Sequence, residues 1–310
     1  MFKGFGLGVI MELRKKYIIY SVVAALILSL VFRCAIVDGF RCLVDKPKNV
    51  VSVIRLEGEI LDSPGCPSWN NIRADVEKAF AHKGLKAVCL LINSGGGSGV
   101  QARIVFNGIR RLAKKKKVSV YSFVEDCACS AAYKIACVGD KIIACTDGSV
   151  VGGIGVIYRG FGYVDIAKKL GIERRIIASH KSKNFLDPYS PVNEHDEKWY
   201  KNEIMDVAYK NFVSFVKRER GKRLKSDSAE LFSGRIWCAE HALSLGLIDD
   251  VKDMQDFVNE HYGKDVAIKW PFVKKKSFMG MPLDAITHLI CSSFRLELKK
   301  LLEQEVGCYN

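Results

Sequence analysis

From Val50 onward, short apolar runs alternate with segments of helical spacing, and this alternation limits the folds open to the chain. The runs Val50–Leu56, Ala87–Ile92 and Val118–Val124 are typical of buried strands, and Asn70–Ala81 is typical of a helix between the first two. Strands joined through helices pair in parallel, with the helices on the faces of the sheet. The expected fold class is therefore α/β, with stacked ββα or βαβ units and a largely parallel sheet.

Two longer helices are expected to pack against this sheet. The first follows Gly95–Gly97, and its apolar face consists of Val100, Ile104, Val105, Ile109 and Leu112. The second covers Asp196–Arg218, and its apolar stripe consists of Trp199, Ile204, Val207, Ala208 and Phe212. Because an amphipathic helix buries its apolar face against a core, we expect both sets of residues to be buried.

The N-terminus has the features of a membrane anchor. A basic cluster, Arg14–Lys16, precedes the uncharged run Tyr17–Phe32, and counting on to Val37 gives enough length to cross a bilayer core of about 30 Å. A cleaved signal peptide is the alternative, but no small-x-small cleavage site follows the run. We therefore expect a single uncleaved transmembrane helix.

These features divide the chain into three parts. Residues 1–46 are expected to form an N-terminal cytoplasmic stub and membrane anchor, 47–265 the α/β domain, and 266–310 a C-terminal basic, amphipathic helical extension. The basic cluster before the span favours a cytoplasmic N-terminus. The α/β domain is then expected on the extracytoplasmic side of the membrane.

The net charge of +14 points to an anionic partner rather than to a fold. The run Lys114–Lys117 is expected at a helix end, where cations complement the helix dipole. The denser cluster Lys217–Lys225 favours anionic lipid, and no motif for nucleic acid accompanies either run. The eleven cysteines show no paired spacing typical of zinc ligands, so neither a metal nor another cofactor is expected.

Three segments have residue types suited to catalysis. The turn Asn93–Gly97 follows a strand, and its glycines allow backbone N–H groups to approach a ligand oxygen. Ser130 stands among small residues at a helix start, where it could also be an ordinary helix cap. Lys183 lies in a loop marked by Asp187 and Pro188, where a lysine is usually solvated. Each signal alone is weak.

Taken in order, these segments resemble the SppA/SohB signal peptide peptidases, relatives of the crotonase and ClpP folds. The matching segments are Asn93–Gly97, Ala128–Tyr133, Val151–Val156, Ser179–Lys183, and Gly234 through Asp249. The resemblance covers about two thirds of the chain. It implies a serine endopeptidase that cleaves hydrophobic peptides such as released signal peptides, held at the membrane and assembled as a homo-oligomeric ring.

The same resemblance assigns roles to individual residues. Ser130 falls on the nucleophile and Lys183 on its general base, while the N–H of Gly96 or Gly97 falls where the family stabilises the oxyanion. Gly153 and Asn93 fall in the surroundings of this dyad. A serine–lysine dyad needs an uncharged, desolvated lysine within hydrogen-bond reach of the hydroxyl.

Three departures from the family pattern leave other functions open. Gly95 replaces a proline, Ala131 and Ala132 replace two glycines, and Gly153 replaces a serine that would bond the lysine. If the backbone φ is positive at the two alanines, they add strain. A membrane-associated scaffold with weak or lost activity is therefore one alternative. A crotonase-type acyl-CoA enzyme, which needs neither a span nor Lys183, is another.

Overall fold

The computed structural model describes residues 49–225 and 229–270. The expected membrane anchor and residues 271–310 of the expected C-terminal extension lie outside these residues. Within the described ranges, no helix combines the length and the apolar character that a bilayer crossing requires. The described residues belong to one compact unit that begins at Asn49.

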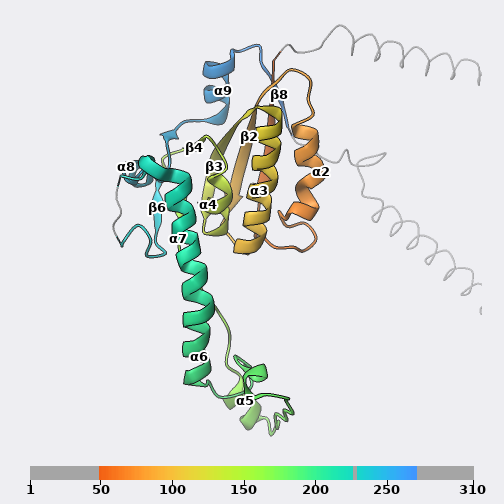
Figure 1. Ribbon diagram of the computed structural model, residues 1–310, viewed down its shortest axis with the longest axis vertical. Helices are drawn as coiled ribbons and strands as arrows, with labels where there is room; N and C mark the ends of the chain where they lie inside the picture. The colour runs from red at the N-terminus through yellow and green to blue at the C-terminus, as the bar shows by residue number, and fades with distance from the viewer. Residues whose placement is uncertain (1–48, 226–228, 271–310) are drawn as a thin grey trace, which may run out of the picture. The chain divides into compact units, whose positions relative to one another are not determined.

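The centre of this unit is a mixed, mostly parallel sheet (Figure 1). Its strands are β1 (Val50–Glu57), β2 (Leu85–Ser94), β3 (Ser119–Cys129), β4 (Lys141–Ala144), β5 (Val150–Gly152), β6 (Ile236–Cys238), β7 (Asp250–Val251) and β8 (Ala267–Lys269). The main path runs β6-β5-β3-β2-β1-β8, while β4 pairs with β3 and β7. Of the pairs described, β5 with β6 is antiparallel, so the expected α/β class with a largely parallel sheet is confirmed.

Helices follow most of the strands. They are α2 (Trp69–Ala79), α3 (Gly99–Lys116), α4 (Ala131–Ala136), α5 (Val164–Lys169), α6 (Glu194–Tyr200), α7 (Asp206–Arg220), α8 (Ala239–Leu245) and α9 (Met254–Tyr262). Short turns complete them: η1 (Lys181–Asn184), the π-helical turn η2 (Lys201–Met205) and η3 (Gly221–Arg223). The side chains of Ser68 and Ser98 accept from backbone N–H groups at the starts of α2 and α3, as helix caps do.

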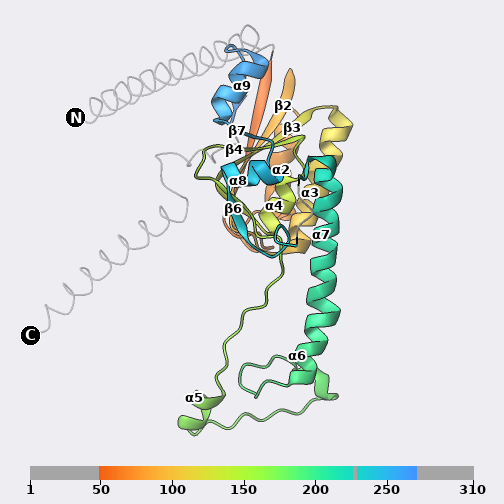
Figure 2. The same ribbon diagram turned by 90° about the vertical axis from the view of Figure 1, so that its left-hand side faces the viewer.

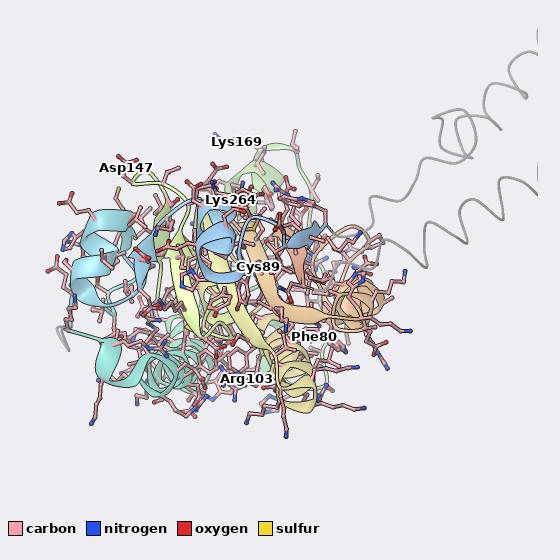
Figure 3. The ribbon with its side chains drawn as sticks, turned by 90° about the horizontal axis from the view of Figure 1, so that it is seen from above. Phe80, Cys89, Arg103, Asp147, Lys169 and Lys264 are labelled. Atoms are coloured by element: carbon pink, nitrogen blue, oxygen red, sulfur yellow. The ribbon has the colours of Figure 1, made fainter. Side chains whose placement is uncertain are left out.

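The sheet separates two apolar clusters, because successive side chains of a strand point to opposite faces. Val88, Leu90 and Ile92 of β2 pack in the larger cluster with α3, α4 and α7. Cys89 of the same strand packs in the smaller cluster with α9. Figure 3 looks along the sheet and shows Cys89 on it, with Arg103 of α3 on one side and α9 on the other.

The apolar face predicted for α3 is only partly correct. Val105 and Ile109 are buried, but Val100 is 69% exposed and Ile104 is 40% exposed. The buried face is instead rotated toward Ala102, Phe106 and Gly108. The first turn of α3 therefore presents apolar side chains that the core does not cover.

The second long helix is continuous but differs more from its prediction. In Figure 2 α6, η2 and α7 form one column, and its first half lies away from the sheet. Phe212 is buried as expected. Trp199, Ile204 and Val207 are exposed, so their predicted burial was wrong for the single chain. We call residues 156–205 the arm; its loop packs onto α6 through Phe185, whose ring centroid is 5.7 Å from that of Tyr200.

A buried arginine fastens α7 to the segment after α8. Arg220 is 2% exposed and donates to the carbonyl of Gly246 and, through two nitrogens, to the carboxylate of Asp249 at 2.7 and 2.8 Å. The hydroxyl of buried Tyr133 donates to the carbonyl of Leu247 at 2.8 Å. The Gly246–Asp249 part of the family-like motif is therefore structural, because it positions α4 and α7 behind Ser130.

Candidate active site

Ser130 lies at the sharp junction between β3 and α4, and its backbone is strained. Its φ is 53° and its ψ is −119°, a region that residues with a Cβ rarely adopt. The junction is held by hydrogen bonds from Ser130 N–H to Gly152 O and from Lys134 N–H to Ser130 O. A side chain on such a strand-to-helix turn stands clear of the sheet, and strained residues cluster at active sites. This geometry suits a nucleophile rather than a helix cap, and no cap hydrogen bond forms.

The glycine turn after β2 lies directly against this junction. Gly96 has a φ of +114°, and a Cβ placed on it would come within 2.8 Å of both Cys129 O and the Ser130 Cβ. Gly97 has a φ of +139°, and a Cβ there would meet the backbone of Ile60 at 2.5 Å. Only glycine, which has no Cβ, allows the chain to come this close to Ser130 at residue 96 and to Ile60 at residue 97.

The two glycine N–H groups differ in availability. The N–H of Gly96 donates to the Ser94 hydroxyl at 3.2 Å. The carbonyl of Gly96 accepts from Ile60 N–H at 2.8 Å, and the trans peptide directs the Gly97 N–H to the opposite side. Within the described chain the Gly97 N–H has no acceptor. Of the two predicted oxyanion donors, Gly97 is therefore the one with a free hydrogen.

Two further residues of the predicted site lie in the same region. Gly153 follows β5 with a φ of +62°, and a Cβ on it would come within 3.2 Å of Ser130 N. The amide of Asn93 donates to Asp126 at 2.6 Å and so joins the ends of β2 and β3. The carboxyl ends of β2, β3 and β5 thus bring Asn93, Gly96, Gly97, Ser130 and Gly153 together, at the edge where parallel sheets commonly bind ligands.

The alanines after the serine add no backbone strain. Neither Ala131 nor Ala132 has a positive φ; both lie in α4 and are buried. The backbone strain expected for alanine at a positive φ is therefore absent at residues 131 and 132.

A cavity of about 700 Å³ opens beside Ser130. Its walls come from α3, α4, the start of the arm and α7, and it is lined by Gly97, Gly99, Val100, Arg103, Ile104, Ser130, Ala131, Lys134, Gly155, Val156, Ile157, Ala208, Asn211, Phe212, Phe215 and Arg218. Val100 and Ile104, which the helical spacing predicted to be buried, form part of this wall. The cavity is mostly apolar, as peptide-binding pockets are.

Lys134 is a lysine of this cavity that the sequence did not single out. It lies four residues after Ser130, one turn along α4, and its Nζ is 4.5 Å from the centroid of the Phe212 ring. Burial lowers the pKa of Lys134 below the ordinary 10.5, and nearby Arg103 lowers that pKa further. The four-residue spacing between Ser130 and Lys134 was the only signal of this proximity in the sequence. The burial of Lys134 depends on α7, which this spacing does not reveal.

The predicted general base is not beside the serine in the single chain. Lys183 lies in η1 of the arm, is exposed, and does not line the cavity that contains Ser130. Within the described residues, no hydrogen bond or ion pair to the Lys183 side chain is present. The structure therefore brings together the predicted nucleophile and the glycine turn, while the predicted base remains on a separate segment.

No cluster of three or more His, Cys, Asp or Glu side chains in the described ranges is arranged to hold a metal ion. Burial raises the pKa of the Cys129 thiol, next to Ser130, to about 11. That thiol is therefore protonated at neutral pH and a poor nucleophile. Ser130, the predicted nucleophile, lines the cavity, and Cys129 does not.

Comparison with known proteins assigns this arrangement to a class. The model of peptidase family S49 matches residues 110–267, about half of the chain and a range that includes Ser130, Gly153 and Lys183. The chain belongs to this family, which comprises serine peptidases of the SppA/SohB type.

Individual relatives carry different names. The chain is 39% identical over 223 residues to a protein of Brucella abortus named Na(+)/H(+) antiporter NhaA, covering 71% of this chain and 30% of that protein. It is 33% identical over 186 residues to a provisionally named protease of Methanocaldococcus jannaschii, and the match covers 60% of this chain and 57% of that protein. It is 29% identical over 187 residues to a provisionally named signal peptide peptidase SppA of Enterococcus faecium, and the match covers 60% of this chain and 53% of that protein. The chain thus spans between about a third and somewhat over half of these relatives.

A solved structure of a membrane-bound stomatin-specific protease is also similar, with 16% identity and a TM-score of 0.46 over 72% of this chain and 97% of that one.

Proposed function

We propose that this protein is a serine endopeptidase in which Ser130 attacks the carbonyl carbon of a peptide bond. The observation that carries the proposal is the strained conformation of Ser130, with a φ of 53°, at the end of β3 and beside a cavity that Ser130 and Gly97 both line. An N–H that binds the developing oxyanion contributes about 3–4 kcal/mol to catalysis. The fold that this implies is the crotonase/ClpP-like arrangement of the family.

The proposed base is Lys183, reached in an assembly rather than within one chain. The arm that carries Lys183 exposes many large apolar side chains: Ile157, Phe161, Ile166, Leu170, Ile172, Ile177 and Val192. Such a surface is unusual for a monomer and suits contact with further copies of the chain. In a homo-oligomeric ring, the arm of one protomer could reach the serine of its neighbour and desolvate the amine.

Three further parts of the proposal rest on the family resemblance. The substrates would be hydrophobic peptides such as released signal peptides, bound as an added strand along the sheet edge. Residues 1–46 would anchor the protein in the bacterial inner membrane, with the catalytic domain on the periplasmic side. No nucleic acid, cofactor or metal takes part in this scheme.

The dyad is tested with four purified proteins: the parent, Ser130→Ala, Lys183→Ala and Lys181→Ala. Lys181 is the matched control, because it is an exposed lysine of the same turn, η1. We expect casein cleavage by the parent and Lys181→Ala, and a loss of at least a hundredfold in the other two. Equal activity in all four would reject the dyad. Retained activity in Lys183→Ala alone would reject Lys183 as base.

The assembly is tested by light scattering during size-exclusion chromatography. The parent is expected to elute as an oligomer, and Phe161→Asp, which places a charge on the apolar arm, is expected to shift toward the monomer. A monomeric parent that cleaves casein at full rate would exclude completion of the site by a neighbour.

Two other functions remain as outcomes of these tests. A catalytically weakened scaffold would bind peptides without cleaving them. A crotonase-type enzyme would bind a CoA thioester and would not depend on Lys183, and titration with acetyl-CoA checks this directly.

A further inference from the structure

The charges around the Ser130 cavity are of one sign. Arg103 of α3, Lys134 of α4 and Arg218 of α7 line it, and none of its lining residues is an aspartate or a glutamate. The remaining wall is largely apolar, with Phe212 and Phe215 beside the cations. A cavity of this kind combines a low-dielectric wall with an uncompensated positive field, so it favours an anionic group with a hydrocarbon stem.

Lys134 is the cation nearest to the serine along the chain, and it forms no ion pair with any residue in the described ranges. Its Nζ lies over the Phe212 ring at 4.5 Å and the Phe215 ring at 5.9 Å. No carboxylate within the described residues pairs with it, and its half-buried position lowers its pKa through desolvation. The cation–π contact offsets only part of the cost of desolvating the amine. A carboxylate entering the cavity would supply the missing partner.

Arg103 and Arg218 differ in how far they are neutralised. The Arg103 guanidinium stacks over Phe215 at 4.6 Å and has no ion pair in the part of the chain that the structure describes. Arg218 already pairs with Glu219 at 3.0 Å. Two unpaired cations, Lys134 and Arg103, therefore face the same cavity from α4 and α3.

We propose that this cavity selects peptides with an acidic residue immediately before the cleaved bond, and that Lys134 is the residue that determines this preference. The inference rests on the proposed peptidase function, and it requires an acidic side chain at this one position of an otherwise hydrophobic peptide. The side chain of the residue whose carbonyl Ser130 attacks is the substrate side chain closest to Ser130, so the cavity that Ser130 and Gly97 line is its place. The methylenes of a glutamate would contact Val100 and Ile104, and its carboxylate would accept from Lys134 and Arg103.

A carboxylate could also come from the C-terminus of a peptide, so the test separates the two sources. Fluorescent peptides are made in three forms: glutamate at the position before the bond with an amidated end, glutamine there with an amidated end, and glutamine with a free C-terminus. A charge-assisted hydrogen bond contributes about 1.5–3 kcal/mol, or roughly 10- to 100-fold in affinity. We expect the first peptide to bind more tightly than the second by this factor. Tighter binding of the third peptide instead would overturn the assignment to a side chain.

Binding is measured on full-length oligomeric protein carrying Ser130→Ala, so that affinity is independent of cleavage. Adding Lys134→Met should remove most of the glutamate preference, measured as the ratio of the affinities for the glutamate and glutamine peptides, and adding Lys134→Arg should retain that ratio. Arg103→Met should reduce the preference by a smaller factor. Lys116→Met is the control, because Lys116 is an exposed lysine at the end of α3 and does not line the cavity. Equal affinity for the glutamate and glutamine peptides in Ser130→Ala would overturn the proposal.

Cleavage by proteins that keep Ser130 distinguishes this inference from the proposed function. With Lys134→Met, we expect the ratio of kcat/KM for the glutamate peptide to kcat/KM for the glutamine peptide to fall by the same factor as the ratio of affinities. An equal loss of kcat for both peptides would mean that Lys134 is the general base, which would overturn its role in specificity. Glutamate-selective binding without cleavage of any peptide would support the inference and reject the peptidase function.

Discussion

Gly96 lies against Ser130 so closely that a methyl group on the glycine would come within 2.8 Å of the serine Cβ. The turn after β2 and the turn after β3 are therefore fitted to each other, and the absence of a side chain at Gly96 sets their separation. Since the N–H of Gly97 belongs to the same turn, this contact also limits the distance between the proposed nucleophile and the proposed oxyanion donor.

Gly96→Ala is expected to reduce kcat/KM by at least a hundredfold. The new methyl would meet Cys129 O and Ser130 Cβ. The first is a backbone atom and the second is bonded directly to the backbone, so neither can rotate away. The positive φ adds about 1 kcal/mol of strain. Peptide cleavage and thermal unfolding are measured together. Gly95→Ala is the control, because it has nothing within 4 Å and no positive φ; equal losses in both variants would contradict the close fit.

Ser130→Gly is expected to be more stable than Ser130→Ala by about 1 kcal/mol. A strained φ costs about 1–3 kcal/mol in a residue with a Cβ, and glycine avoids that cost at a smaller entropic one. Free energies of unfolding from urea titrations of the two inactive variants provide the comparison. Ala131→Gly should show the opposite sign, a loss of about 1 kcal/mol, since residue 131 is helical. If glycine destabilised position 130 as well, the serine would not be strained.

The sequence predicted β1, β2, the first part of β3 and the glycine turn after β2, because these depend on local patterns. A continuous apolar run such as Ala87–Ile92 is typical of a buried strand, and consecutive glycines at a strand end indicate a turn with special φ angles. Helix faces were predicted less well. The spacing of Val100 and Ile104 shows that they share a face, but it does not say whether a core or an open cavity lies opposite.

The continuous helix of α6, η2 and α7 illustrates the same limit on a larger scale. Trp199, Ile204 and Val207 form a stripe that any amphipathic helix would show, and periodicity cannot identify the surface that covers it. Lys134 was missed for a related reason. Its desolvation comes from Phe212 and Phe215, which are about 80 residues away in the chain and reach it only because α7 packs beside α4.

Arg220→Met is expected to destabilise the protein by about 3–5 kcal/mol. Removing one partner of a buried, bidentate pair leaves Asp249 without its main donor and the carbonyl of Gly246 unsatisfied. The free energy of unfolding in urea measures the loss. Arg73→Met is the control, since it breaks an exposed pair with Glu77 one helical turn away and should cost less than about 1 kcal/mol. Similar losses of unfolding free energy in the two variants would show that burial does not increase the contribution of the Arg220–Asp249 pair to stability.

Buried thiols are expected to make the fold sensitive to alkali. Burial raises the pKa of Cys89 and of Cys137 from the ordinary 9.0 to about 12. Above pH 9 the unfolded chain loses these protons while the native chain keeps them, so stability is full below pH 9 and falls as the pH rises toward 12. Each thiol contributes a slope of up to about 1.4 kcal/mol per pH unit.

Cys89→Ala should reduce this slope between pH 9 and 11, whatever its effect on stability at neutral pH. Urea titrations at half-unit pH steps give the slope for each variant. Val88→Ala is the matched control: it removes buried volume from the neighbouring position of β2 without removing a thiol, so it should lower stability and leave the slope at the parental value. A Cys89→Ala protein with an unchanged slope would mean that the Cys89 thiol ionises in the native state as readily as in the unfolded chain.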